Sequence, residues 1–201
     1  MVTKRKQTPL RRVKSKRVND GSKWASRPRV DIYSPSEISA MNATSRHSGV
    51  VGNRAIVPRV VEKIVKHGDV ILDFGAGKNA VQAQQLMNKG YDVIAYEMGK
   101  NFNPLYHFKD ALNYRYNIVY ASNVVNVQHS DEQIYNLLSL LHELIVNDGK
   151  VVINYPQSPR YAVKQDGDIV STKEVEDIAK SIFYRVTPVR GYSAPVFILE
   201  K

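Results

Sequence analysis

Two hydrophobic periodicities alternate along most of the chain. Short runs of apolar and β-branched residues, of strand length, are separated by longer stretches in which apolar residues recur every three or four positions. The longer stretches predict helices over residues 58–67, 79–89, 131–146 and 172–183, with a shorter helix over 35–41 after Ser34 and Pro35. The short runs predict strands over residues 70–74, 91–96, 105–108, 118–121, 150–155, 185–189 and 196–200.

Strands that alternate with helices indicate an α/β fold with a mostly parallel sheet. The last predicted helix is followed by two strands around Gly191, which predicts an antiparallel edge strand at the C-terminal end. We therefore expect one α/β domain over residues 57–201. Residues 31–56, rich in Ser, Asn and Gly, would be a connecting or lid segment between this domain and residues 1–30.

The segment from Asp69 to Ala80, DVILDFGAGKNA, carries the strongest chemical signal. A predicted strand containing one acid, Asp73, runs into a turn with two glycines, Gly75 and Gly77, and a predicted helix follows. A turn of this kind at the carboxyl end of a parallel strand forms a ligand site, because backbone N–H groups of the turn and helix face the ligand.

Several interpretations of this turn compete. A phosphate-binding loop ends in Gly-Lys-Ser or Gly-Lys-Thr, whereas Asn79 follows Gly77 and Lys78 here. Gly75, Gly77 and Ala80 fit the dinucleotide motif that tolerates alanine last, but that motif does not account for the acid on the strand. A buried strand with a tight turn and no ligand is a further alternative.

The order of acids along the chain resembles that of the class I S-adenosylmethionine-dependent methyltransferases. In that family an acid at the first strand precedes G-x-G, a second acid ends the next strand, and an acid or amide follows the third. The resemblance implies a Rossmann-like methyltransferase sandwich that binds S-adenosylmethionine, with Asp73 toward its ammonium group, Glu97 on its ribose and Asp110 on its adenine amine. The donor-binding residues that it implies are Asp73, Gly75, Gly77, Glu97, Asp110, Ala111 and Ser122.

The segment from Ser122 to Val127 (SNVVNV) occupies the place of the family's fourth motif. It lacks the two prolines and the aromatic residue that methyltransferases of exocyclic base amines carry there. It is similar to a valine- and asparagine-containing segment of methyltransferase-like proteins encoded by phages and beside DNA phosphorothioation genes. Asn123 and Asn126 are candidate catalytic residues that would orient the acceptor, and the alternative is that they cap the end of the strand.

Four other side chains have both a functional and a structural interpretation. His129 has an ordinary pKa that suits a base, but a histidine before a helix is more often a solvated neighbour of the cap. Tyr155 is a candidate substrate contact or simply part of a loop. Arg46 and His47 would either fold over the donor or lie in a surface loop.

Charge is concentrated at the N-terminus. Eleven of the 29 basic residues and one of the 19 acidic residues fall within residues 1–30, which leaves eighteen of each elsewhere. The net charge of +10 therefore belongs to a basic arm on a neutral domain. Such a segment cannot bury enough apolar area to fold alone, and it is attracted to polyanions. We expect it to bind nucleic acid, chiefly through Lys4, Arg5, Lys6, Arg11, Arg12, Lys14, Lys16 and Arg17.

Composition excludes several further classes of protein and of site chemistry. No apolar run approaches the roughly 18 residues of a membrane span, and the N-terminus lacks the apolar stretch of a secretory signal, so we expect an intracellular protein. The absence of cysteine excludes disulfides, cysteine-ligated zinc and covalent cytosine methylation through a cysteine, and we predict no metal site.

Three functions therefore stay open. The first is a methyltransferase that acts on or near nucleic acid through the basic arm. The second is a methyltransferase for a protein or a small molecule. The third is a non-catalytic protein with the methyltransferase fold and a structural or interaction role, for example in a phage.

Overall fold

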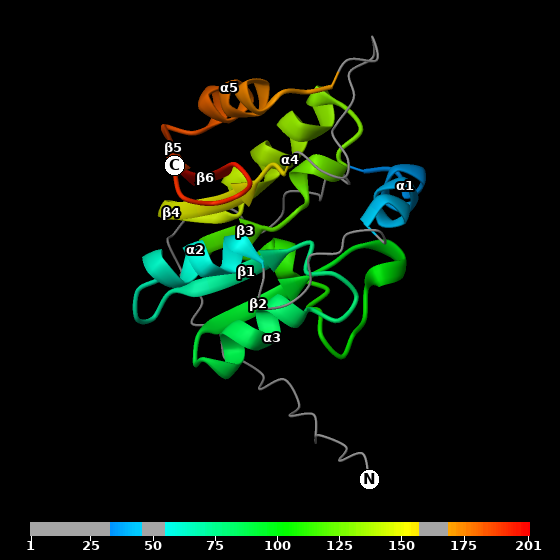
Figure 1. Ribbon diagram of the computed structural model, residues 1–201. Coiled ribbons are helices and arrows are strands. Elements are labelled where there is room, and N and C mark those ends of the chain that lie inside the picture. The colour runs from blue at the N-terminus through cyan, green and yellow to red at the C-terminus, as the bar shows by residue number, and fades with distance from the viewer. Residues whose placement is uncertain (1–32, 46–54, 157–168) are drawn as a thin grey trace.

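The computed structural model describes residues 33–45, 55–156 and 169–201 (Figure 1). A six-stranded sheet in the order β2-β1-β3-β4-β6-β5 forms its centre. The first four strands of that order run parallel, whereas β6 pairs antiparallel with both β4 and β5. The strands are β1 (Val70–Phe74), β2 (Asp92–Tyr96), β3 (Tyr116–Ala121), β4 (Ile145–Asn154), β5 (Arg185–Val189) and β6 (Val196–Glu200). The predicted α/β fold, mostly parallel with an antiparallel C-terminal edge, is confirmed.

Helices cover both faces of the sheet, because successive strand residues point to opposite sides. In β1, Ile71 packs in the cluster that contains α2 (Ile56–Ile64) and α3 (Val81–Asn88). Leu72 and Phe74 pack in the opposite cluster with α4 (Asp131–Glu143) and α5 (Thr172–Ile182). The remaining helix, α1 (Pro35–Ser45), lies against the segments that follow β2 and β3 (Figure 1).

Local signals explain where the larger helices begin. The Ser130 side chain accepts a hydrogen bond from the Gln133 backbone N–H at 3.1 Å, which caps α4. Ser171 and Glu174 form a reciprocal capping box at the start of α5. Among the described residues, no helix is both long and apolar enough to cross a lipid bilayer.

The prediction of a strand over residues 105–108 is wrong. Asn103 and Pro104 instead begin a turn, in which the Asn103 carbonyl accepts from the N–H groups of Tyr106 and His107. The segment touches the sheet through a hydrogen bond from Phe108 N–H to Ala95 O at 2.9 Å, and Leu105 is 67% exposed. As a result, β2 forms the edge of the described sheet.

The boundary between α4 and β4 also differs from the prediction. The helix ends at Glu143, not at residue 146, and the strand begins at Ile145, not at residue 150. Tyr116 pairs with Ile145, and Ile118 pairs with Lys150. Between these two pairs β4 advances by five residues, whereas β3 advances by two. The extra residues form a bulge in which a Cβ on Gly149 would lie 2.7 Å from Ile145 Cβ. Leu144 and Ile145 continue the apolar spacing of the helix, which is why the periodicity misplaces this boundary.

Smaller corrections apply to the helices around β1. The helix α2 begins at Ile56 and ends at Ile64, earlier than the predicted 58–67. The helix α3 begins at Val81 instead of residue 79, because Ala80 has a left-handed backbone conformation with φ of 43°. Helix α1 extends to Ser45, four residues beyond its predicted end.

We predict that Leu141→Ala lowers the free energy of unfolding by about 2 to 5 kcal/mol, because it leaves a cavity in the core between α4 and the sheet. Leu105→Ala is the matched control, and it should change the free energy by no more than about 0.5 kcal/mol because that side chain is exposed. Urea unfolding of both variants measures this. A large loss for Leu105→Ala would contradict the turn and support a buried strand there.

Candidate functional site

The site begins at the glycine turn that follows β1. Gly75 and Gly77 have φ angles of 76° and 70°, a conformation that costs little only for glycine. The backbone N–H groups of Gly75 and Ala76 both donate to the carbonyl of Tyr96, each at 3.0 Å. The turn is therefore tied to the end of β2, which brings the carboxyl ends of the two strands together.

Both backbone polar groups of Gly77 are held by buried side chains. Its N–H donates to Glu97 Oε2 at 2.7 Å, and the other oxygen of Glu97 accepts from Met98 N–H at 2.8 Å. Its carbonyl lies 2.9 Å from His107 Nε2. Because His107 Nδ1 accepts from Asn103 N–H at 2.8 Å, the proton of the neutral ring lies on Nε2, which donates to Gly77 O.

Burial shifts both titratable groups toward their neutral forms. It raises the pKa of Glu97, against the hydrogen bonds from Met98 and Gly77 that lower it. It lowers the pKa of His107, against its hydrogen bonds with Gly77 and Asn103. A neutral His107 is the form that can accept at one nitrogen and donate at the other, so the pKa shift and the hydrogen-bond pattern agree.

Asp73 lies beneath this turn and is only 1% exposed. Its pKa is raised to about 7, chiefly by burial and also by the nearby Glu97 carboxylate, whereas the Tyr120 hydroxyl and the Ala83 backbone N–H act in the opposite direction. Ala83 lies in the first turn of α3, whose N-cap residue Ala80 offers no side-chain cap. Asp73 therefore takes the place of a capping acid at the positive end of α3.

Unsatisfied polar atoms gather at the same end of the sheet. Among the described residues, five buried side-chain atoms lack a hydrogen bond of ordinary geometry: Asp73 Oδ2, Asp92 Oδ1, Tyr120 Oη, Ser122 Oγ and Asn126 Oδ1. All except Asp92 lie at, or just after, the carboxyl ends of β1 and β3. Asp73 and Tyr120 are neighbours that interact with each other, so the clearest unused hydrogen-bonding atoms are those of Ser122 and Asn126. Because buried polar atoms normally have partners, this end of the sheet has hydrogen-bonding capacity that a bound molecule can use.

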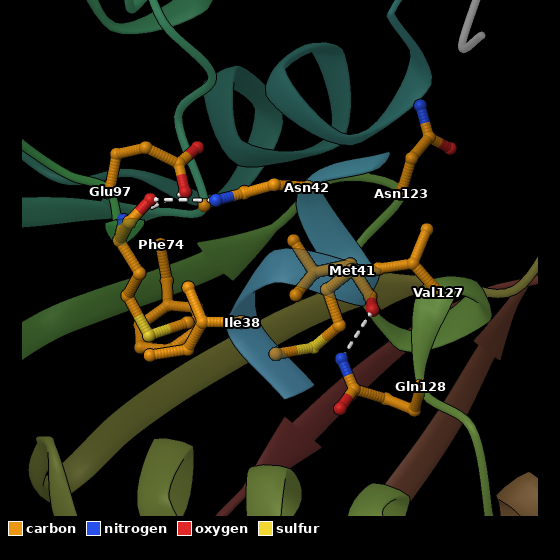
Figure 2. A pocket seen from close by; sticks show the side chains of 11 residues that line it. Ile38, Met41, Asn42, Phe74, Glu97, Asn123, Val127 and Gln128 are labelled. Carbon is orange, nitrogen blue, oxygen red and sulfur yellow. Dashed lines mark hydrogen bonds between the residues drawn. The ribbon is translucent and has the colours of Figure 1, made fainter. Parts of the chain in front are cut away.

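A cavity of about 60 Å³ lies beside the turn (Figure 2). Phe74 and Gly75 line it from the end of β1, and Glu97 and Met98 from the end of β2. The segment after β3 and helix α1 complete its wall. Those residues are Asn123, Val124, Val127, Gln128, Ile38, Met41 and Asn42.

Helix α1 and Tyr33, which precedes it, narrow this cavity because they join the segment after β2 to the segment after β3. On one side, Asn42 Nδ2 donates to Met98 O at 3.3 Å, and a Cβ on Gly99 would lie 2.5 Å from Ile38. On the other side, the Tyr33 hydroxyl donates to Gln128 Oε1 at 2.8 Å. In Figure 2, Ile38 and Met41 lie between Phe74 and Val127.

The cavity is too small for a nucleoside ligand in this conformation. An engineered cavity of about 150 Å³ holds a single benzene molecule, and the cavity here is less than half that size at about 60 Å³. Three of its lining residues belong to α1. A larger ligand must therefore either displace α1 from the ends of β1 and β2 or extend out of the cavity through its open side.

The structure brings some of the predicted donor-site residues together and separates others. Gly75 and Glu97 line the cavity, Gly77 completes the turn, and Asp73 lies below it. Ser122 offers a free buried oxygen after β3. Asp110 is exposed, and the Ala111 carbonyl accepts from the Tyr116 hydroxyl at 2.6 Å; neither residue lines the cavity.

The two candidate catalytic asparagines differ in their surroundings. Asn123 lines the cavity with φ of 59°, its N–H donates to Asn154 Oδ1, and its own Oδ1 accepts from Asn154 Nδ2, both at 2.7 Å. These bonds join the ends of β3 and β4, as the capping alternative expects. Asn126 is buried after β3, and its Oδ1 has no partner among the described residues.

The other candidates have structural surroundings or lie elsewhere. His129 is exposed beside the cap of α4. Tyr155 is fully buried, and its hydroxyl donates to Val170 O at 2.6 Å. Arg46, His47 and the basic residues of 1–30 lie outside the described residues.

Sequence reasoning missed several residues of the site. His107 lies in the segment mistaken for a strand, and nothing in its neighbours signals its contact with Gly77. Tyr120 pairs in register with Asp73, which becomes visible only once β1 and β3 are known to be adjacent. Asn42 belongs to a helix whose polar spacing gives no sign that it covers a cavity.

Comparison with known proteins bears on the fold. No protein-family model matches the chain, and no curated protein matches it in sequence. A TehB-like SAM-dependent methyltransferase from Corynebacterium glutamicum has a TM-score of 0.55 at 14% identity, over 83% of this chain and 97% of that one. The chain has the class I methyltransferase fold.

Two further structures share this fold. A SAM-dependent methyltransferase from Bacteroides fragilis, in complex with S-adenosyl-L-homocysteine, has a TM-score of 0.55 at 10% identity, over 81% of this chain and 93% of that one. A 1,6-didemethyltoxoflavin-N1-methyltransferase from Burkholderia thailandensis has a TM-score of 0.53 at 18% identity, over 87% and 91% of the two chains. At these identities the likeness establishes the methyltransferase fold and does not identify the methyl acceptor.

We predict that Asp73→Asn removes a pH dependence of stability. The pKa of Asp73 is about 7 in the folded chain against an ordinary value of 3.8, so the folded state binds this proton more readily than the unfolded state. The resulting stabilisation is fully present below pH 3.8 and is lost as the pH rises through 7. Urea unfolding across this range should show wild type losing stability relative to the variant.

Titrating groups that do not interact with Asp73, such as His107, are present in both proteins and cancel in this comparison. Glu97 interacts with Asp73, so part of the difference reflects the coupled titration of the two carboxyls. A difference between the two free energies of unfolding that stays constant with pH would contradict the raised pKa.

Proposed function

We propose that this protein binds S-adenosylmethionine at the glycine turn after β1 and transfers its methyl group. The observation that carries the proposal is the convergence of the Gly75–Gly77 turn, Glu97 and several unpartnered buried polar atoms at the carboxyl ends of β1, β2 and β3. Ligands of doubly wound sheets bind at this edge. The solved structures that share the fold include methyltransferases bound to SAM or to S-adenosylhomocysteine.

The side chains at this site are chemically suited to bind S-adenosylmethionine. Each oxygen of Glu97 accepts one backbone hydrogen bond, and a carboxylate oxygen can accept a second, so the ribose hydroxyls have acceptors at the end of β2. Asp73 provides a buried carboxyl below the turn, next to the Tyr120 hydroxyl. A cationic donor nearby would favour the charged form of Asp73 and so offset the burial that raises its pKa.

Methyl transfer requires little from the protein except that it positions the donor and the acceptor. The donor, when bound, supplies a methyl group on a positively charged sulfur, which an acceptor atom attacks directly. Holding the two reactants in line lowers the barrier without a strong base. Asn123 and Asn126 lie after β3, on the segment that borders the cavity, and they are our candidates for orienting the acceptor.

We propose nucleic acid as the acceptor or its carrier. The support is the excess of eleven bases over one acid in residues 1–30, attached to a domain with equal numbers of each. Such an arm binds phosphate backbones without reading sequence. The alternatives are a protein or small-molecule acceptor, and an interaction or structural role without catalysis.

We predict that the full chain binds S-adenosylhomocysteine and that Glu97→Gln weakens this binding tenfold or more. A hydrogen bond to a charged acceptor is worth about 1.5 to 3 kcal/mol, and about 1.4 kcal/mol corresponds to a factor of ten. Isothermal titration calorimetry measures both affinities. Glu143→Gln, at the exposed end of α4, is the matched control and should bind as wild type does.

Absence of binding by the wild-type chain would favour the non-catalytic alternative. Equal affinities of wild type and Glu97→Gln would place the ligand elsewhere on the protein.

We predict that the chain transfers label from methyl-labelled S-adenosylmethionine to nucleic acid. Separate pools of DNA, RNA and protein are incubated with the full chain, and Glu97→Gln provides the inactive control. Label in the DNA or RNA pool supports the proposed acceptor. Label in the protein pool alone would contradict it in favour of a protein acceptor, and donor binding without label in any pool would contradict the enzymatic role.

A further inference from the structure

A second group of basic residues, separate in sequence from residues 1–30, lies on the part of the chain that the structure describes. Arg59 and Lys63 project from α2 to the ring of Tyr192, with the Arg59 guanidinium carbon 5.8 Å and Lys63 Nζ 5.4 Å from its centroid. Lys63 Nζ also donates to the Tyr192 hydroxyl at 3.0 Å. Arg190 lies in the same turn between β5 and β6, and all three cations are exposed. We call Arg59, Lys63, Arg190 and Tyr192 the α2 cluster.

The α2 cluster has unbalanced charge. Arg59 and Lys63 are four residues apart on one helix, a spacing at which like charges repel. Within the described ranges, no carboxylate forms an ion pair with either of them or with Arg190, and Glu62 of the same helix pairs with Lys89. The Tyr192 ring offsets part of this repulsion through cation–π contacts. An anion bound between the cations would offset the rest.

The position of the cluster relates it to the candidate site. Val196, at the start of β6, pairs with Asn154 at the end of β4 and with Val189 at the end of β5, so the turn between them lies at the carboxyl edge of the sheet. Pro195 of this turn accepts from Tyr155 N–H at 3.0 Å. Asn154 bonds to Asn123, which lines the cavity. The cluster and the candidate acceptor residues therefore share one edge of the sheet.

We propose that the α2 cluster binds the phosphate backbone of a nucleic acid that lies along the carboxyl edge of the sheet. This inference rests on the proposed action on nucleic acid and adds a contact on the folded domain. Cations held in place by an aromatic ring lose less side-chain freedom when they bind a phosphate. Because the contacts are to phosphate, DNA and RNA are both candidates, and parallel probes of each distinguish them.

The test is the salt dependence of binding by the full chain. The variant Arg59→Gln, Lys63→Gln, Arg190→Gln removes three charges from the cluster. The control Lys173→Gln, Lys180→Gln, Arg185→Gln removes three charges from α5 and the start of β5, where each cation pairs with an acid. Affinities for labelled single-stranded DNA and RNA are measured by fluorescence anisotropy over a range of salt concentrations.

The cluster variant should bind more weakly, and its plot of log affinity against log salt should be less steep by about 2, since each phosphate contact on a single strand contributes about 0.7. The charge-matched control should keep the wild-type slope more closely. Equal slopes for the two variants would overturn the proposal. So would an unchanged slope with a lowered melting temperature, because the cluster would then serve only to hold the β5–β6 turn on α2.

Two further measurements separate this proposal from the function on which it rests. Binding of S-adenosylhomocysteine by the cluster variant should match wild type, because no cluster residue lines the cavity. If the wild-type chain binds neither DNA nor RNA, the nucleic-acid acceptor and the cluster proposal both fail while donor binding stands. If the cluster variant loses affinity for polyglutamate and keeps its affinity for both nucleic acids, the proposal fails in favour of an acidic protein partner.

Discussion

The conformation of the glycine turn after β1 is the constraint on which the candidate site depends. Three groups hold its backbone: the Tyr96 carbonyl, the Glu97 carboxylate and the His107 ring. The turn needs positive φ at Gly75 and Gly77. Its conformation fixes where α3 begins and which backbone groups lie next to Asp73. The end of β2 is fixed by the same bonds, so two of the acids that would meet a donor are positioned by one small turn.

Helix α1 narrows the opening of this site. Its contacts with the segments after β2 and β3 leave a cavity of about 60 Å³. The ends of β1, β2 and β3 are held by hydrogen bonds within the sheet, whereas α1 is held by side chains across the opening. If a donor displaces α1 when it binds, the free energy of binding includes the cost of breaking those side-chain contacts. A ligand that displaces α1 gains access to Glu97 and to the unpartnered atoms below the turn.

Much of this arrangement could be predicted from the sequence, for physical reasons. The apolar strands and the caps of α4 and α5 are local signals, and Asp73, Gly75 and Glu97 lie at strand ends that a parallel sheet must bring together. Contacts between distant segments carry no such signal. His107 lies in a loop whose apolar neighbours suggested a strand, and the covering by α1 depends on Tyr33 and Asn42 reaching residues far along the chain. The left-handed Ala80 and the bulge at Gly149 arise from packing as well.

We propose that the cavity beside Gly75 and Glu97 is a donor site that opens further when α1 moves. A crystal structure of the full chain with S-adenosylhomocysteine tests this most directly. We expect the ligand to lie against the Gly75–Gly77 turn with its ribose hydroxyls on Glu97, and we expect α1 to be displaced from Met98 and Gln128. A ligand bound elsewhere, or a ligand at the turn with the contacts of α1 intact, would contradict it.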